Sequence, residues 1–389
     1  MSLVGVRRVR VAGVYFPTLA NRDALAAAAN AHDLGPCQSF SSLEAMLESG
    51  EIDAIWLLNP TYARLVSMRA IHTARKPGRT SVYAIDCEKP LAGTLVEARE
   101  MLALAEDARL LHSYLEDQVF STAVQRGHDV ILRRAVPSAG RPYIARAAEE
   151  HSGPHEARFW IAHRQVDGVL SDMMCHSVEV ARFLFTAPGE RRDALSLKFA
   201  SGNIATLKSR RPEYAAKLKS ARGGKVDYAT RPAGDFTRGL LTFEDPDGNE
   251  IIVEATTSWA YVGPGPRLSI ELLGSGYAME YNSLTSGLKI FLSRAVTGSA
   301  GEDLVEKQSV EQGSMPVMED EAGTYGYTAE NRHMVESFRD RRAPVETFDN
   351  GVVLVEMLMA LDCSAELGRT LSLPDPAVET YIPLAARRA

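Results

Sequence analysis

The 389-residue sequence has few cysteines, and they lie far apart: Cys37, Cys87, Cys175 and Cys363, with no C-x-x-C pair. This spacing is typical of reduced thiols in the cytoplasm and excludes a disulfide or zinc framework as the basis of the fold. No apolar run approaches the length of a membrane span. The arginines near the N-terminus are not followed by a long apolar segment and cleavage site, so no secretory signal is expected. We therefore expect a cytoplasmic protein.

Excess positive charge and repeats are missing as well. The chain carries 43 Lys and Arg against 50 Asp and Glu, a formal net charge of -7, which argues against nucleic acid as the main partner. Neither an internal repeat nor a low-complexity tract is visible, which excludes a solenoid. The chain is long, and 45% of its residues are hydrophobic. A single hydrophobic core does not usually hold a chain of this size, so two domains are expected.

The N-terminal third alternates between strand-like and helix-like segments. The expected strands are at residues 9–15, 52–58, 81–87 and 110–116, and the expected helices at 21–31 (with Asn21 as N-cap), 41–50 (capped by Ser41 or Ser42), 63–74 and 93–109 (capped by Thr94). The segment at residues 52–58 is a continuous apolar run ended by Asn59 and Pro60, which is typical of a strand covered on both faces in a parallel sheet. This order predicts a doubly wound parallel sheet.

Polar groups gather where these strands end, which is the edge at which parallel sheets bind ligands. One end contains Asn59 and Pro60, followed by Tyr62, whose flat ring can stack on a ligand; the next contains Glu88 and Lys89 before a proline. A solvated turn is the alternative explanation for the Glu-Lys-Pro sequence. A further strand end contains Asp117.

The segment from residue 169 to residue 185 shows helical periodicity and places Asp172 and His176 one turn apart on one face. Histidine suits proton transfer from an alcohol, because its pKa lies near working pH. Lys89 could polarise the carbonyl oxygen, and Asp172 could orient the imidazole or bind a substrate hydroxyl. A structural ion pair and a metal-ligand pair remain alternatives for Asp172 and His176. No convincing third ligand accompanies them, so no metal is expected.

The pattern changes after residue 190. Alternating segments on both sides of an Asp245–Gly248 turn, and again at residues 267–283 and 287–294, predict antiparallel strands.

Four stretches, residues 51–60, 87–106, 167–185 and 331–373, resemble the glucose–fructose oxidoreductase / inositol dehydrogenase / MocA (Gfo/Idh/MocA) family in order and spacing. The resemblance implies a Rossmann-like domain followed by an α+β domain with a large, mostly antiparallel open sheet. We expect the first at residues 1–120 and the second at 121–375, with closing helices at 328–372 and a tail at 376–389.

The same resemblance implies an NAD(P)-dependent dehydrogenase or reductase of sugars, cyclitols or related polyols, and a homodimer or homotetramer paired through the second-domain sheet. It implies catalytic roles for Lys89, His176 and Asp172. The cofactor-binding set that it implies is Asn59, Pro60, Tyr62, Glu88, Lys89 and Asp117, and the substrate-binding set is Trp160, His163 and Arg164. Redox-neutral, NAD-assisted glycosidic chemistry and a non-catalytic binding or assembly role are the alternatives.

One family feature is missing: no G-x-G-x-x-G sequence occurs before residue 150. That loop normally supplies backbone N–H groups for the cofactor pyrophosphate. We therefore expect that the first strand–loop–helix unit is lacking. A shortened start, a true loss and a rebuilt sheet are the three explanations. Phe16 stands where an acidic residue would distinguish NAD from NADP, so the sequence does not choose between them.

Overall fold

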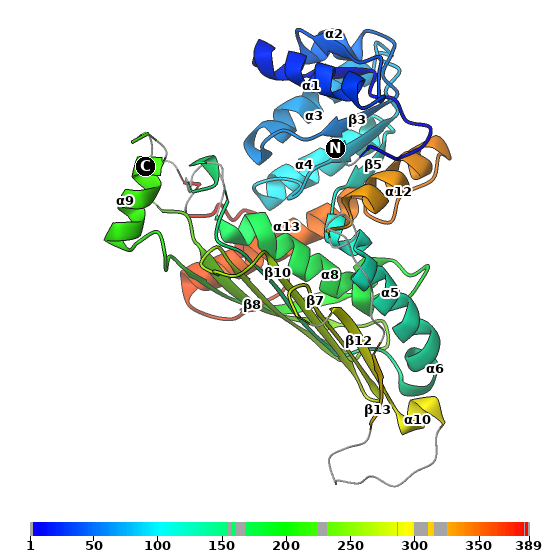
Figure 1. Cartoon of the computed structure of the whole chain (residues 1–389), viewed down its shortest axis with the longest axis vertical. Helices are drawn as coiled ribbons and strands as arrows, with labels where there is room; N and C mark the ends of the chain where they lie inside the picture. The colour runs from blue at the N-terminus through cyan, green and yellow to red at the C-terminus, as the bar shows by residue number, and fades with distance from the viewer. Residues whose placement is uncertain are drawn as a thin grey trace. The chain divides into compact units, whose positions relative to one another are not determined.

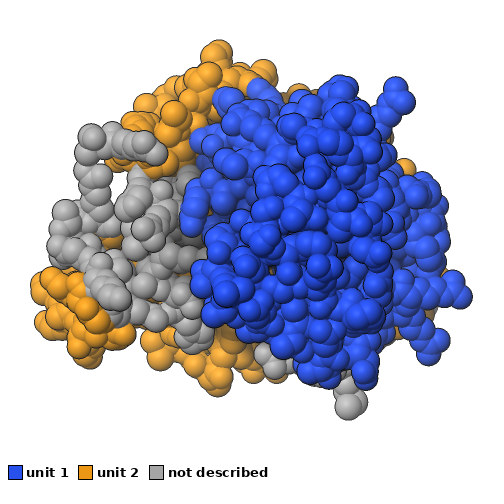
Figure 2. Space-filling view, turned by 90° about the horizontal axis from the view of Figure 1, so that it is seen from above, with its two compact units in different colours: residues 1–117, 326–355 blue, residues 118–325, 356–389 orange. Residues whose placement is uncertain are grey.

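We analysed a computed structural model of the chain, which describes residues 3–154, 157–160, 168–221, 223–224, 232–285, 287–298, 310–314, 325–384 and 386–387. The chain divides into two compact units (Figure 2). The first unit comprises Met1–Asp117 and Gly326–Val355, and the second comprises Gln118–Tyr325 and Glu356–Ala389. Helix α13 therefore begins in one unit and ends in the other.

The first unit is built from parallel strands alternating with helices (Figure 1). Its strands are β1 (Gly13–Tyr15), β2 (Gln38–Phe40), β3 (Ala54–Leu57), β4 (Ala84–Cys87) and β5 (Leu111–Tyr114). Its helices are α1 (Leu19–Ala31), α2 (Leu43–Leu47), α3 (Thr61–Arg75), α4 (Leu95–Asp107), α12 (Tyr327–Arg339) and the first residues of α13 (Phe348–Leu367). The parallel pairing predicted from the continuous apolar runs is confirmed.

The helix starts in this unit are set by local hydrogen bonds. Ser42 accepts a bond from the N–H of Ala45, and Thr94 accepts one from the N–H of Glu97, so both predicted caps are confirmed. The predicted cap at Asn21 is wrong. The backbone is extended at Thr18 and helical from the next residue, so α1 begins earlier than its alanine-rich stretch indicated.

The parallel strands form two sheets rather than one. Strand β1 pairs with β2, while β3, β4 and β5 form a separate sheet in that order. Helix α1 is poorly covered, since only Ala26 and Ala29 of its thirteen residues are buried. The small sheet therefore contributes little to the core, which lies around β4, where all four residues are buried.

The second unit is dominated by a nine-stranded sheet in the order β13-β12-β11-β10-β6-β9-β8-β7-β14. Its strands are β6 (Ile144–Glu150), β7 (Ser196–Ala205), β8 (Phe236–Glu244), β9 (Glu250–Ser258), β10 (Arg267–Gly274), β11 (Tyr277–Asn282), β12 (Gly287–Ser293), β13 (Val310–Ser314) and β14 (Leu371–Ser372). Strands β6 and β9 pair in parallel, and the other neighbouring strands are antiparallel. The expected fold class, a parallel sheet followed by a large, mostly antiparallel one, is confirmed.

Helices of the second unit cover one face of its sheet, as Figure 1 shows for α5 and α8. The helices are α5 (Thr122–Val130), α6 (Val136–Ala139), α8 (Cys175–Phe185), α9 (Pro212–Ala221), α10 (Arg294–Thr297) and α14 (Pro376–Glu379). Two π-helical turns, Ile131–Ala135 and Leu170–Met174, and three 3₁₀ turns, Asp117–Phe120, Ala157–Trp160 and Arg192–Ala194, complete the regular structure. Helix α8 packs on the central strands β6 and β9, which places its residues over the middle of the sheet.

The strands of this sheet have the alternation expected of a sheet with one covered face. In β6, Ala145 and Ala147 are buried while Arg146 between them is exposed. A tight turn joins β8 to β9, and the predicted Asp245–Gly248 turn is confirmed: Asp245 accepts bonds from the N–H groups of Asp247 and Asn249. No helix in the described part of the chain is long and apolar enough to cross a membrane.

Candidate functional site

The side chain that follows β3 has one polar atom with a hydrogen-bond partner and one without a partner among the described residues. Asn59 follows the strand, and its Nδ2 donates to Ser67 Oγ at 3.0 Å. Its Oδ1 is shielded from solvent and accepts no hydrogen bond from any described residue. A buried acceptor of this kind is costly unless a ligand or water completes it. Tyr62, the second residue of α3, is 65% exposed, so its ring is open for stacking.

The end of β4 carries a half-buried acid and amine. Glu88 and Lys89 follow Cys87, and the peptide bond between Lys89 and Pro90 is cis. The N–H of Glu88 donates to the carbonyl of Leu57 at 3.1 Å, which ties this turn to the end of β3. Burial raises the pKa of the Cys87 thiol to about 12, which makes that group a poor nucleophile.

Several carboxyl groups near these turns repel one another. Asp86 on β4 is fully buried and accepts a hydrogen bond from Ser113 Oγ at 2.5 Å. Burial raises the pKa of Asp86 to about 7. Burial, followed by repulsion from Asp117, Asp86 and other acids, raises the pKa of Glu330 on α12 well above its usual range. Sequence reasoning did not find Glu330, because it lies more than 200 positions away from its neighbours Asp86 and Asp117.

The family resemblance implies that Asn59 and the Glu88–Lys89 turn contact the nicotinamide half of a dinucleotide. This role stays a prediction. The connection from β1 to α1 is Phe16-Pro17-Thr18, and a proline has no N–H to donate. Among the described residues this connection offers no glycine cradle for a pyrophosphate, which agrees with the missing G-x-G-x-x-G sequence.

In the second unit, Asp172 and His176 lie in two different kinds of helix. Asp172 is half-buried within the π-helical turn Leu170–Met174, while His176 is 5% exposed in the first turn of α8. The continuous α-helix expected here is wrong at its start. In a π-helical turn the bonds run from i to i+5, so the four-residue spacing no longer equals one turn. The proton-transfer role of the two residues stays a prediction. Cys175 is buried, as expected.

Buried charges hold α8 in place. Glu179 on α8 is fully buried and forms ion pairs with Arg182 on the same helix and with Arg192, at 2.7 Å, in the following 3₁₀ turn. Arg182 is also fully buried. Removing the acid would leave two guanidinium groups enclosed without their counter-charge, so the network fixes the helix that carries His176.

Trp160 lies in a core cluster of the second unit. It is 2% exposed and packs with Val169, Met173 and Trp259, and its Nε1 donates to the Pro154 carbonyl at 3.1 Å. These contacts favour a packing role, and its substrate role stays a prediction. The other two expected substrate residues, His163 and Arg164, lie outside the described residues.

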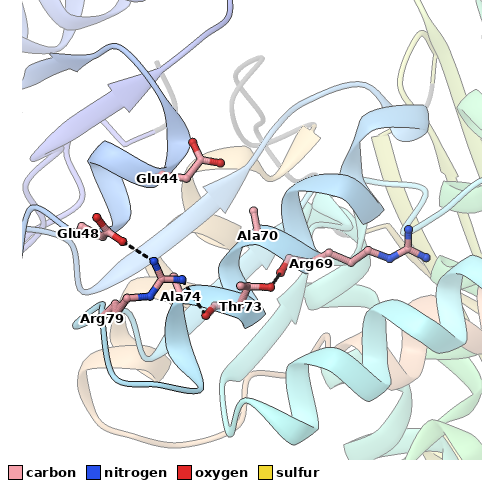
Figure 3. Close-up of a pocket in the computed structure, with 7 residues that line it drawn as sticks. All are labelled: Glu44, Glu48, Arg69, Ala70, Thr73, Ala74 and Arg79. Atoms are coloured by element: carbon pink, nitrogen blue, oxygen red, sulfur yellow. Dashed lines mark hydrogen bonds and ion pairs between the residues drawn. The ribbon is translucent and has the colours of Figure 1, made fainter.

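A separate hollow of about 220 Å³ lies on the surface of the first unit between α2 and α3 (Figure 3). Its lining residues are Glu44, Glu48, Arg69, Ala70, Thr73, Ala74 and Arg79. Arg79 points at Glu48 and bonds it at 2.8 Å, while the guanidinium of Arg69 points away from the hollow and bonds Glu100. The cations are thus already paired, and none of the predicted site residues lines the hollow.

Comparison with known families finds a match over residues 4–115 to the family described as "Oxidoreductase family, NAD-binding Rossmann fold", which is the GFO_IDH_MocA family. A curated relative, 1,5-anhydro-D-fructose reductase from Ensifer adhaerens, is 24% identical over 197 residues. This alignment covers 50% of the chain and 55% of the reductase, so the chain spans about half the length of the curated relative that it matches.

Solved structures match almost the whole chain. GenD2 from gentamicin A biosynthesis, in complex with NAD, superposes with a TM-score of 0.70 at 20% identity, covering 96% of this chain and 92% of GenD2. Levoglucosan dehydrogenase in complex with NADH and levoglucosan gives a TM-score of 0.68 at 15% identity, covering 94% of this chain and 91% of that one. Similarity at this level of identity establishes the fold.

Proposed function

We propose that this chain, which belongs to the Gfo/Idh/MocA oxidoreductase family, transfers hydride between a nicotinamide dinucleotide and a hydroxyl or carbonyl carbon of a sugar, cyclitol or related polyol. The observation that carries the proposal is the strand-end arrangement of the first unit. The buried, unsatisfied oxygen of Asn59 and the half-buried Lys89 lie at adjacent strand ends, inside the stretch that matches the NAD-binding family. The sugar substrates of the relatives named above support the substrate class.

The proposed chemistry divides the work between two residues. Alcohol oxidation needs a base for the hydroxyl proton while hydride leaves the carbon; the bound nicotinamide supplies the hydride acceptor. We assign the base to His176, because a ring nitrogen of an imidazole can accept the hydroxyl proton and return it. We assign Lys89 to the same oxygen, where an ammonium group stabilises developing negative charge. Asp172 would bind a substrate hydroxyl or orient the imidazole.

The first test of the proposed function is cofactor binding. NAD is the proposed cofactor because of the family match. Titration of protein into NADH and into NADPH, followed by nicotinamide fluorescence, should show saturable binding to NADH. Absence of saturable binding would refute the proposal. It would favour a non-catalytic binding or assembly role, which the lack of a glycine cradle among the described residues also supports.

Turnover then tests the residues. With an active sugar substrate, Lys89→Met should lower kcat by about 10²- to 10³-fold, the usual cost of removing one group that stabilises developing negative charge. Lys198→Met is the matched control, because Lys198 pairs with Glu244 on the sheet of the second unit. Unchanged turnover in both Lys89→Met and His176→Ala would eliminate the assigned mechanism.

We further propose that the chain forms a homodimer or homotetramer through the uncovered face of the second-unit sheet. A hollow of about 510 Å³ lies on this face, and there Arg146 bonds Glu254 at 3.1 Å and Glu271 at 3.0 Å. Charged groups on a pairing face can fix the register between two copies. Sedimentation velocity measures the oligomeric state. A cytoplasmic location is proposed from the four free thiols.

A further inference from the structure

A buried arginine lies behind the two turns proposed to contact the nicotinamide. Arg64 is on the inner face of α3 and is only 3% exposed. Enclosing a guanidinium is costly unless its donors are satisfied, so the partners of this group show what the position requires.

Among the described residues, the hydrogen-bond partners of Arg64 are backbone carbonyls. Its Nε donates to the carbonyl of Asn59 at 3.0 Å, and its Nη2 donates to the carbonyl of Lys89 at 3.0 Å. Its Nη1 donates to the carbonyl of Pro90. One planar group therefore joins the turn after β3 to the turn after β4.

A carboxylate would be the usual partner if this arginine served to neutralise charge. No carboxylate among the described residues forms an ion pair with Arg64, although Arg69, one and a half turns further along α3, pairs with Glu100 on α4. The two arginines of the same helix thus have different roles. Arg69 bridges two helices at the surface, and Arg64 holds backbone.

We infer that Arg64 is a positioning residue that locks the Asn59–Pro60 turn and the Lys89–Pro90 turn together, so that the groups of both turns meet the cofactor in one fixed arrangement. The part of this inference that concerns the cofactor rests on the proposed function. A lysine is no substitute, because its ammonium is a single point of charge and cannot present a rigid fork of donors to separate carbonyls.

Hydrogen exchange followed by mass spectrometry tests the locking without any cofactor. Arg64→Lys should raise the exchange rate about tenfold or more in peptides covering residues 57–63 and 87–92, since both turns lose a shared restraint. Arg69→Met is the matched control and should leave both peptides as in the wild type. Exchange in Arg64→Lys that equals the wild type in both peptides would overturn the inference.

Cofactor affinity gives the second measurement. Arg64→Lys and Arg64→Met should each weaken NADH binding about tenfold or more, a change of one decade in Kd, while Arg69→Met binds like the wild type. If Arg64→Met does not fold, Arg64→Lys carries the test, because it keeps the charge and the alkyl stem. If Arg64→Lys binds NADH as tightly as the wild type does, the inference is also overturned.

The outcomes separate this inference from the function on which it rests. A wild-type chain that does not bind NADH refutes the proposed function, while the exchange rates still decide whether Arg64 locks the turns. Binding by the wild type together with loss in Arg64→Lys, but not in Arg69→Met, supports both.

Discussion

Glu179→Gln should be among the most damaging single substitutions in the second unit. Glu179 and Arg182 are 0% exposed, and Arg192 is 6% exposed. Both arginines donate to the same carboxylate. The glutamine keeps the shape of the side chain but removes the negative charge, so two enclosed guanidinium groups lose their ion pair with Glu179.

The expected cost follows from this burial. Removing one partner of a buried ion pair typically costs about 3–5 kcal/mol, because the remaining charge cannot be resolvated. Arg182 is fully enclosed, so we expect the loss in Glu179→Gln to fall within that range. A surface pair next to the network gives the scale for comparison: Arg191 and Asp193 are mostly exposed, and such pairs contribute about 0–1 kcal/mol.

Urea unfolding followed by tryptophan fluorescence can report on the second unit alone. The chain has three tryptophans, of which Trp56 lies in the first unit and Trp160 and Trp259 lie in the second. In a Trp56→Phe background, the free energy of unfolding should fall by about 3–5 kcal/mol in Glu179→Gln and by less than about 1 kcal/mol in Asp193→Asn.

Apolar replacement of the whole network gives a second check on the same reasoning. If the damage comes from stranded charge, the triple variant Glu179→Leu/Arg182→Leu/Arg192→Met should recover much of the stability lost in Glu179→Gln, as happens when buried ion pairs are replaced together. A loss in Glu179→Gln no larger than that in Asp193→Asn would refute the reasoning.

Two other predictions concern pH and close packing. Burial raises the pKa of Asp86 to about 7, whereas the unfolded chain loses this proton near pH 4. The folded state therefore binds more protons than the unfolded state between these two pH values, so the free energy of unfolding falls as pH rises through this range. Asp86→Asn should reduce this pH dependence by up to about 1.4 kcal/mol per pH unit, as measured by urea unfolding. If the slope is the same in Asp86→Asn, the carboxyl is not held protonated. A Cβ at Gly202 on β7 would lie 2.0 Å from the Leu361 carbonyl oxygen of α13, so Gly202→Ala should lower the free energy of unfolding by about 1–3 kcal/mol. A Cβ at Gly265 would make no close contact, so Gly265→Ala should be nearly neutral. Equal Tm values for the two variants would contradict this close packing.

Features that depend on neighbouring residues were predictable from the sequence. The Ser42 and Thr94 caps and the Asp245–Gly248 turn are each closed by hydrogen bonds that span two to four residues. The strands β3 and β4 were recognisable from short segments rich in apolar residues, although β3 is only partly buried and β4 contains the buried Asp86. The position of Lys89 at a strand end followed directly from these local patterns.

Features that depend on distant residues were decided by tertiary structure. The sequence pattern of α3 shows only that Arg64 is helical; its role appears when the Lys89 carbonyl, 25 positions away, is brought to its guanidinium. Glu330 meets Asp86 and Asp117 only because residues 326–355 fold back into the first unit. The separation of β1 and β2 from the other parallel strands has the same origin. Local propensity and apolar periodicity determine which elements form, whereas long-range packing decides which elements meet and which buried charges they enclose.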